Sequence, residues 1–144
     1  SSDIDLIFLF DEEGETRATP EFPNARRTLT VQEFYERLAR RVIPALNDIE
    51  GPGFVFRVDM RLRPTGNKSP AATQFAGFEA YHAGEAEIWE EMALTRARVV
   101  AGDAGLARRA QSAIEEILRR QRKPAKVAAA VLEMRALIAR EKGE

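Results

Sequence analysis

The sequence predicts an α+β fold in which a small mixed sheet with one connecting helix is followed by a helical tail. Two stretches, residues 3–10 and 54–63, have the apolar pattern of β-strands. A helical pattern at residues 30–47 joins them, and its length allows the two strands to be neighbours in one sheet. From residue 72 onward the apolar spacing is that of helices.

The first predicted strand carries two carboxylates on one face. Asp3 and Asp5 are two residues apart, whereas Ile4 and Leu6 point to the other face. Neighbouring like charges repel each other, and a bound cation would remove that cost. Hard oxygen ligands of this kind suit Mg²⁺. The alternative is that Asp3 caps a turn and Asp5 lies on a solvated strand edge.

A long polar loop leads into the connecting helix. It covers residues 11–29, and a loop of this length is usually functional or disordered. Thr30 is the expected N-cap of the helix, and Glu33 completes a capping box. We expect the helix to end near Asn47, because a Gly-Pro-Gly breaker follows at residues 51–53.

The second predicted strand separates an apolar face from a charged one. Residues 54–63 alternate almost completely, and Pro64 closes the strand because it has no N–H to donate. The charged face consists of Arg57, Asp59, Arg61 and Arg63. Such arginines also suit a solvated edge strand that resists aggregation, but this alternative does not explain the acid among them.

On adjacent strands the acidic residues would form one site. Asp59 can stand on the same face as Asp3 and Asp5, and three such carboxylates are typical of a two-metal phosphoryl-transfer site that uses Mg²⁺. The residues that would hold the phosphates of a nucleotide are Arg61, Arg63, Asn67 and Lys68. The sequence therefore predicts metal-dependent phosphoryl transfer at this edge of the sheet.

The tail is predicted to be helical at residues 72–82, 84–101, 104–122 and 124–142. Asp103 is the expected cap of the third of these helices, and Pro124 fits the first turn of the last.

The helix expected at 84–101 contains apolar residues at helical spacing and two arginines. We expect Trp89, Met92 and Val99 to lie in the core rather than in a site. Arg96 and Arg98 are expected to form ion pairs rather than to contact a nucleotide. The candidate partners are Glu90, Glu91 and Asp59.

Composition excludes several classes of protein. The formal net charge of −1 argues against a nucleic-acid binder, which is normally basic. Cysteine is absent and there is 1 histidine, which excludes thiolate and multi-histidine chemistry. The sequence has no apolar run of about 18 residues, the length that a membrane span needs. It also has no signal-peptide pattern, and we therefore expect a cytoplasmic protein with no membrane partner.

Four stretches together resemble a known enzyme family. The Asp-x-Asp strand within residues 2–8 and the apolar-Asp-apolar motif within residues 57–64 are similar to the polymerase-β-like nucleotidyltransferase superfamily. With residues 89–90 and 93–103, they resemble more closely the glutamine synthetase adenylyltransferase/adenylyl-removing family, also called glutamate–ammonia-ligase adenylyltransferase. The resemblance implies a polymerase-β-like nucleotidyltransferase fold.

The resemblance also implies a role for each candidate residue. Asp3, Asp5 and Asp59 would be the catalytic, metal-binding carboxylates, and Asp59 would help to deprotonate or orient the incoming hydroxyl. Ser2 would be the remainder of a Gly-Ser turn that contacts the nucleotide. We therefore expect a nucleotidyltransferase core at residues 1–70 that is incomplete at its N-terminus. Residues 71–144 would form a helical segment that packs on this core or extends from it.

The implied activity is Mg²⁺-dependent transfer of AMP from ATP to a tyrosine hydroxyl of glutamine synthetase, which regulates nitrogen assimilation. Glutamine synthetase and a nitrogen-signalling regulatory protein are the implied partners. Residues 65–70, 93–103 and 133–138 favour the C-terminal, adenylylating half of the enzyme. The alternatives are the phosphorolytic, adenylyl-removing half, a nucleotidyltransferase with another acceptor such as an antibiotic, and a helical interaction module in which the aspartates are incidental.

Overall fold

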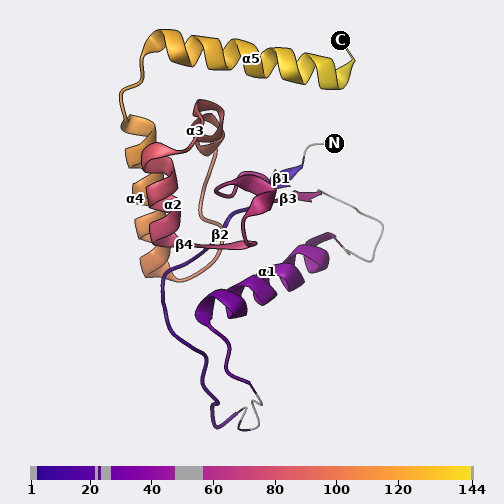
Figure 1. Ribbon diagram of the computed structural model, residues 1–144, viewed down its shortest axis with the longest axis vertical. Coiled ribbons are helices and arrows are strands. Elements are labelled where there is room, and N and C mark those ends of the chain that lie inside the picture. The colour runs from indigo at the N-terminus through magenta and orange to yellow at the C-terminus, as the bar shows by residue number, and fades with distance from the viewer. Residues whose placement is uncertain (1–2, 22, 24–26, 48–56, 144) are drawn as a thin grey trace. The chain divides into compact units, whose positions relative to one another are not determined.

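The computed structural model describes residues 3–21, 23, 27–47 and 57–143, and it divides the chain into two compact units, Ser1–Phe78 and Glu79–Glu144. The first unit contains two pairs of parallel strands and a long helix, and the second is helical (Figure 1). This content confirms the predicted mixture of strands, a connecting helix and a helical tail. In place of the predicted single mixed sheet, the described residues form two separate sheets of two parallel strands each. The polymerase-β-like fold and the division after residue 70 stay predictions.

The two strands that carry the aspartates are neighbours. β1 (Ile4–Asp5) pairs in parallel with β3 (Val58–Asp59), with Ile4 opposite Val58 and Asp5 opposite Asp59. The Ile4 N–H donates to the carbonyl of Arg57 at 2.8 Å, and the Leu6 N–H donates to that of Asp59 at 2.9 Å. The predicted adjacency is therefore confirmed. The start of the second predicted strand, residues 54–56, lies outside the described residues.

A second pair of strands was predicted only in part. The apolar run after β1 continues as β2 (Phe8–Phe10), so the strand expected at residues 3–10 consists of two short strands. β2 pairs in parallel with β4 (Ala72–Gln74), which the apolar spacing predicts to be the start of a helix. That assignment was wrong because these three residues pair with β2, and α2 (Phe75–Gly84) begins only after them.

The connecting helix α1 (Val31–Asn47) begins as predicted, and its described residues extend to Asn47. The Glu33 N–H donates to the Thr30 hydroxyl at 3.1 Å, and the Thr30 N–H donates to the Glu33 carboxylate at 3.0 Å, which is the expected capping box. Pro44 lies inside the helix and has no N–H for the preceding turn, yet the helix continues to Asn47.

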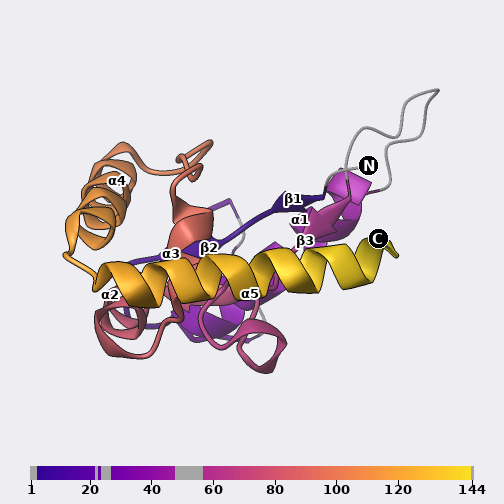
Figure 2. The same ribbon diagram turned by 90° about the horizontal axis from the view of Figure 1, so that it is seen from above.

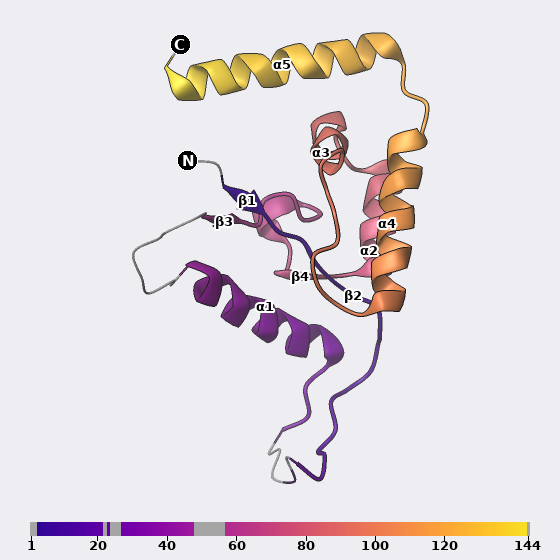
Figure 3. The ribbon, with the colours of Figure 1, turned by 180° about the vertical axis from the view of Figure 1, so that it is seen from behind.

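Two side chains of α1 bind the backbone of a single residue of β4. Gln32 Nε2 donates to the Ala72 carbonyl at 3.0 Å, and the Ala72 N–H donates to Glu36 Oε2 at 3.2 Å. Both backbone polar groups of this buried residue are thereby satisfied by α1, which lies along the strands (Figure 3). Burial raises the pKa of Glu36, but hydrogen bonds from Arg40 and from the backbone of Ala72 and Ala71 outweigh it and lower the pKa below its ordinary value.

The core of the first unit lies between α1 and the strands. The buried residues of this cluster are Phe10, Ala39, Met60, Ala71 and Ala72. Around this cluster pack partly buried side chains from α1 and the strands, including Tyr35, whose ring stacks on that of Phe10 with 5.2 Å between the ring centroids. Three of the five buried residues are alanines, which allows the helix to approach the strands closely.

β3 ends earlier than the alternation predicts. The backbone turns after Asp59, because its carboxylate accepts the Arg61 N–H at 2.8 Å, and the Arg63 N–H donates to the Met60 carbonyl at 3.3 Å. The predicted extension of the strand to residue 63 is therefore wrong. A short 3₁₀ helix, η1 (Gly66–Lys68), follows.

The turn after β3 is held by its own side chains and backbone. Arg63 Nε donates to the Ser69 carbonyl at 3.2 Å, and Arg63 Nη1 donates to the Met60 carbonyl at 3.1 Å. The Ser69 hydroxyl donates to the Pro64 carbonyl and is also hydrogen-bonded to the hydroxyl of Thr65. Thr65 has a φ of 57°, a left-handed conformation that a β-branched residue rarely adopts.

The second unit consists of α3 (Ile88–Leu94), α4 (Ala104–Arg119), α5 (Pro124–Lys142) and the end of α2. The predicted cap of α4 is confirmed, since the Asp103 side chain accepts the Leu106 N–H at 2.8 Å. Pro124 lies in the first turn of α5, also as predicted. α3 lies against the N-terminal half of α5 (Figures 1 and 2).

The helix expected at residues 84–101 is wrong in extent, because α3 covers only seven of these residues. The Thr95 hydroxyl donates to the Met92 carbonyl at 2.7 Å at the end of α3. Trp89 and Val99, which we expected in the core, are 38% and 39% exposed.

Polar contacts tie the helices of the second unit together. The buried Glu90 carboxylate accepts the Tyr81 hydroxyl at 2.9 Å and the Glu87 N–H at 2.8 Å. Glu91 accepts Arg122 Nε at 2.9 Å, and this ion pair raises the pKa of Arg122. The partners that the structure gives these two acids are therefore Tyr81 and Arg122, in place of the expected arginines of residues 96 and 98.

Replacing Glu36 tests the anchoring of β4 by α1. Glu36→Ala leaves the buried Ala72 N–H without its acceptor, and we expect it to lower the free energy of unfolding by about 1.5–3 kcal/mol. Urea unfolding followed by circular dichroism measures the change. The control is Glu115→Ala, because Glu115 also pairs with an arginine four residues later but is more exposed than Glu36. This control should change the free energy of unfolding by less than about 0.5 kcal/mol. Equal losses in the two variants would contradict the anchoring role.

The lowered pKa of Glu36 predicts a pH dependence. A carboxylate whose pKa is lower in the folded chain stabilises it above the ordinary glutamate pKa of about 4.3, and this contribution is lost as the pH falls through the lowered value. Glu36→Gln should therefore be less stable than the parent at pH 7, and the difference should shrink toward pH 3, as measured by urea unfolding at both pH values. A difference that stays constant across this range would exclude the carboxylate as its source.

Replacing Arg63 tests the turn after β3. Arg63→Gln loses both guanidinium hydrogen bonds to backbone carbonyls, and we expect a loss of about 1–3 kcal/mol and faster amide hydrogen exchange at Gly66 and Ser69. Arg57→Gln is the matched control, because Arg57 is an exposed arginine six residues earlier. If both variants exchange at the parent's rate, Arg63 does not hold the turn.

Candidate metal and nucleotide site

The centre of the candidate site is a pair of aspartates on two adjacent strands. Asp5 and Asp59 are directly opposite in the parallel register of β1 and β3. Side chains of residues in register project from the same face of a sheet. Asp3 directly precedes β1 and is exposed. The register therefore places Asp5 beside Asp59, and the metal-binding role of all three aspartates stays a prediction.

The carboxylate of Asp59 is held by the residue two positions later. Its Oδ1 accepts the Arg61 N–H at 2.8 Å, and its Oδ2 accepts Arg61 Nε at 2.6 Å. Arg61 Nη2 also lies 2.6 Å from the same Oδ2. Hydrogen bonding from the Arg61 side chain is the main cause that lowers the pKa of Asp59, against the effect of burial. Asp59 is thus kept ionised, which is the form that binds a cation.

The donor chemistry of this pair fits Mg²⁺. That ion commonly takes one or two protein carboxylates and completes its shell with water and substrate phosphates. Within the described ranges, His, Cys, Asp and Glu side chains do not gather in a group of three or more that could hold a metal. Two carboxylates in register on adjacent strands are therefore a donor set that suits a metal ion whose shell is completed by water and substrate phosphates.

The predicted nucleotide-binding residues have different surroundings. Arg63 is half-buried, and two of its nitrogens already donate to the backbone of the turn. Asn67 and Lys68 are exposed on η1. Ser2 lies outside the described residues. Among the described residues predicted to bind phosphate, Arg61 is hydrogen-bonded to the carboxylate of Asp59.

One positioning residue was not identified from the sequence. Asn47, the last residue of α1, accepts the Val58 N–H through its side-chain Oδ1 at 3.2 Å. This bond ties the end of α1 to the residue that precedes Asp59. The sequence shows an asparagine near the end of the predicted helix, but the residue to which it is hydrogen-bonded is identified only by the fold.

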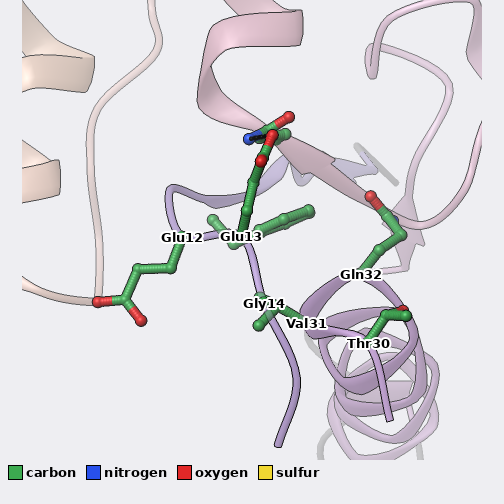
Figure 4. Close-up of a pocket in the computed structure, with 8 residues that line it drawn as sticks. Glu12, Glu13, Gly14, Thr30, Val31 and Gln32 are labelled. Atoms are coloured by element: carbon green, nitrogen blue, oxygen red, sulfur yellow. Dashed lines mark hydrogen bonds between the residues drawn. The ribbon is translucent and has the colours of Figure 1, made fainter.

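The described part of the chain also contains an open pocket of about 220 Å³ at the other end of α1. It is lined by Phe10, Glu12, Glu13, Gly14, Thr30, Val31, Gln32 and Gln74. The Glu13 carboxylate accepts Gln74 Nε2 at 3.2 Å, whereas Glu12 points away from the other labelled side chains (Figure 4). None of the predicted site residues lines this pocket.

Among the residues that the structure describes, no helix is both long and apolar enough to cross a bilayer.

Comparison with known proteins supplies the family. The family model described as glutamate-ammonia ligase adenylyltransferase matches residues 1–113. A protein of Agrobacterium fabrum, named bifunctional glutamine synthetase adenylyltransferase/adenylyl-removing enzyme, is 45% identical over 141 residues, which are 98% of this chain and 14% of that protein. A protein of the same name from Bradyrhizobium diazoefficiens is 41% identical over 100% of this chain and 14% of its own length. One from Nitrosococcus oceani is 50% identical over 72% of this chain and 10% of its own length.

The alignments cover most of this chain but only a small part of each of these relatives. Nearly all of this chain aligns with the Agrobacterium protein, yet it spans only 14% of that protein's length. The matched residues include β1, β3 and the aspartate pair, because the family model covers residues 1–113. The chain belongs to the glutamate–ammonia ligase adenylyltransferase family.

Proposed function

We propose that this chain is a Mg²⁺-dependent nucleotidyltransferase domain that transfers AMP from ATP to a tyrosine hydroxyl of glutamine synthetase. The observation that carries the proposal is the register that puts Asp5 opposite Asp59, with Asp3 just before the same strand. Family membership supports the same reaction class, because the relatives are named as adenylyltransferases.

The proposed step is a displacement at the α-phosphorus of ATP. The tyrosine oxygen forms a bond to the α-phosphorus, and the bond from that phosphorus to the oxygen bridging the α- and β-phosphates breaks. Pyrophosphate leaves, and the hydroxyl proton passes to solvent. Asp3, Asp5 and Asp59 would hold the Mg²⁺ ions, which neutralise charge on the phosphates and on the attacking and leaving oxygens.

The protein's own residues would bind and orient the reactants. Asp59, whose pKa is lowered, remains ionised, so it is better suited to orient the tyrosine hydroxyl than to receive its proton. Arg61 would bind phosphate oxygens, and Arg63 would shape the turn that bears Asn67 and Lys68.

The direction of the reaction is part of the proposal. The sequence resemblance favours the adenylylating half, whereas the relatives' name includes both the transfer and the removal of the adenylyl group. In the removing reaction, inorganic phosphate attacks the phosphorus of adenylyl-tyrosine, and ADP is released. Glutamine synthetase is the proposed protein substrate in either case, and a nitrogen-signalling regulatory protein is a further proposed partner. We place the reaction in the cytoplasm, as expected from the sequence.

Incubation with glutamine synthetase and α-labelled ATP tests the proposal. We expect label on a tyrosine of glutamine synthetase only when Mg²⁺ is present. Asp59→Asn should reduce the rate by at least about 100-fold, because even the residues that merely support metal ligands cost 10–100-fold when replaced. Mass spectrometry of the labelled peptide identifies the acceptor.

The outcomes separate the alternatives. Release of ADP from adenylylated glutamine synthetase with phosphate, without transfer in the forward assay, would assign the chain to the removing half. Transfer to a small molecule only would indicate another acceptor. If Mg·ATP leaves the melting temperature of both the parent and Asp59→Asn unchanged, and no transfer occurs in either direction, the enzyme proposal is wrong.

A further inference from the structure

The two oxygens of the Asp59 carboxylate are held in different ways. Oδ1 accepts a backbone N–H, that of Arg61, at 2.8 Å. Oδ2 is bound by the guanidinium of the same residue, with Nε and Nη2 each at 2.6 Å. A backbone N–H in a turn is fixed, whereas a side chain can rotate away. Departure of the guanidinium would therefore expose Oδ2 while Oδ1 still fixes the orientation of the carboxylate.

Exposure shows which partner can move. The Asp59 side chain is 14% exposed and the Arg61 side chain is 69% exposed. The guanidinium therefore lies on the solvent side of a mostly covered carboxylate, where an incoming cation would arrive. A divalent cation brings two positive charges to this carboxylate where the guanidinium brings one, so it can replace the arginine at Oδ2.

The neighbouring arginine does not have this freedom. Arg63 Nε and Nη1 donate to the carbonyls of Ser69 and Met60, and they close the turn that follows β3. Leaving these contacts would leave two backbone carbonyls without their donor. Of the two arginines after Asp59, Arg61 is the one whose guanidinium binds the carboxylate, whereas that of Arg63 binds the carbonyls of the turn.

Charge determines where the arginine goes. A divalent cation at Oδ2 and a guanidinium at the same oxygen would repel each other strongly. A nucleotide brings phosphate oxygens, whose geometry matches the fork of a guanidinium. The early end of β3 makes this exchange possible, because the turn at Met60 returns both the N–H and the side chain of Arg61 to the Asp59 carboxylate.

We propose that Arg61 is an exchangeable counter-ion of Asp59: it occupies Oδ2 in the free protein, yields that oxygen to the divalent cation and then binds the phosphates of the nucleotide. The inference rests on the proposed function, since it concerns the same site. It makes Arg61 a positioning residue with two opposite effects: it competes with the metal alone and strengthens binding of the metal–nucleotide complex.

Binding measurements on Arg61→Gln test the exchange. Mn²⁺, followed by electron paramagnetic resonance, serves as the probe for the metal alone, and Mg²⁺ with a non-hydrolysable ATP analogue serves as the probe for the complex. Without its competitor, Mn²⁺ should bind about 3–5-fold more tightly to Arg61→Gln, as expected from the loss of an exposed ion pair. The Mg²⁺–nucleotide complex should bind about 10-fold more weakly, because a charge-assisted contact to phosphate is lost.

Two further variants make the result specific. Arg57→Gln removes an arginine two residues before Asp59 and serves as the control for the general loss of positive charge. It should change both affinities by less than about 2-fold. Arg61→Lys keeps the charge but not the fork, so it should restore the competition with Mn²⁺ and recover only part of the nucleotide affinity. This conservative variant keeps the test decisive if Arg61→Gln unfolds.

The outcomes distinguish this inference from the proposed function. Tighter Mn²⁺ binding together with weaker nucleotide binding supports the exchange. Weaker binding of both probes, or equal effects of Arg57→Gln and Arg61→Gln, overturns it while leaving the nucleotidyltransferase proposal intact. If the parent chain binds neither probe and Asp59→Asn changes nothing, the proposed function itself fails.

Discussion

The parallel pairing of β1 with β3 is the constraint on which the candidate site depends. Parallel neighbours need a long crossover between them, and α1 lies in this connection. The described ladder consists of only two residue pairs, too few to be stable by itself. Its register must therefore be fixed by what packs against it, and the relative position of the two aspartates depends on the packing of α1.

α1 is tied to one strand of each pair, β4 and β3, through polar contacts as well as through apolar burial. Near its start, Gln32 and Glu36 bind both backbone polar groups of Ala72. At its end, Asn47 accepts the N–H of Val58, the residue before Asp59. Hydrogen bonds are directional, so these contacts define how far α1 can slide along the strands, whereas apolar burial alone would tolerate small shifts. One helix thus positions both β3 and β4.

Features that depend on local chemistry could be predicted from the sequence. The capping box of Thr30 and Glu33 defines the start of α1, and the Asp103 cap defines that of α4. The adjacency of β1 and β3 followed from the length of the connecting helix. The family was likewise recognisable, because the motifs around the aspartates are distinctive in their order.

Features that depend on tertiary contacts could not be predicted in this way. The alternation of residues 54–63 continues past Asp59, but it does not reveal that this carboxylate captures the N–H of Arg61 and turns the chain. β4 has no strand pattern of its own and exists because β2 offers a partner. The metal-binding role of the three aspartates remains a prediction, as does the polymerase-β-like fold. Ser2 lies outside the described residues.

Three buried alanines, Ala39, Ala71 and Ala72, lie in the cluster between α1 and the strands. Their small size affects the position of α1 as well as the packing. Ala39 is 2% exposed, so a larger side chain there would lift α1 away from the strands. Gln32 and Glu36 would then no longer reach the backbone of Ala72, and Asn47 would draw away from Val58. The alignment of Asp5 and Asp59 therefore depends partly on the small size of three buried side chains, and a larger residue at one of these positions would change the candidate site from a distance.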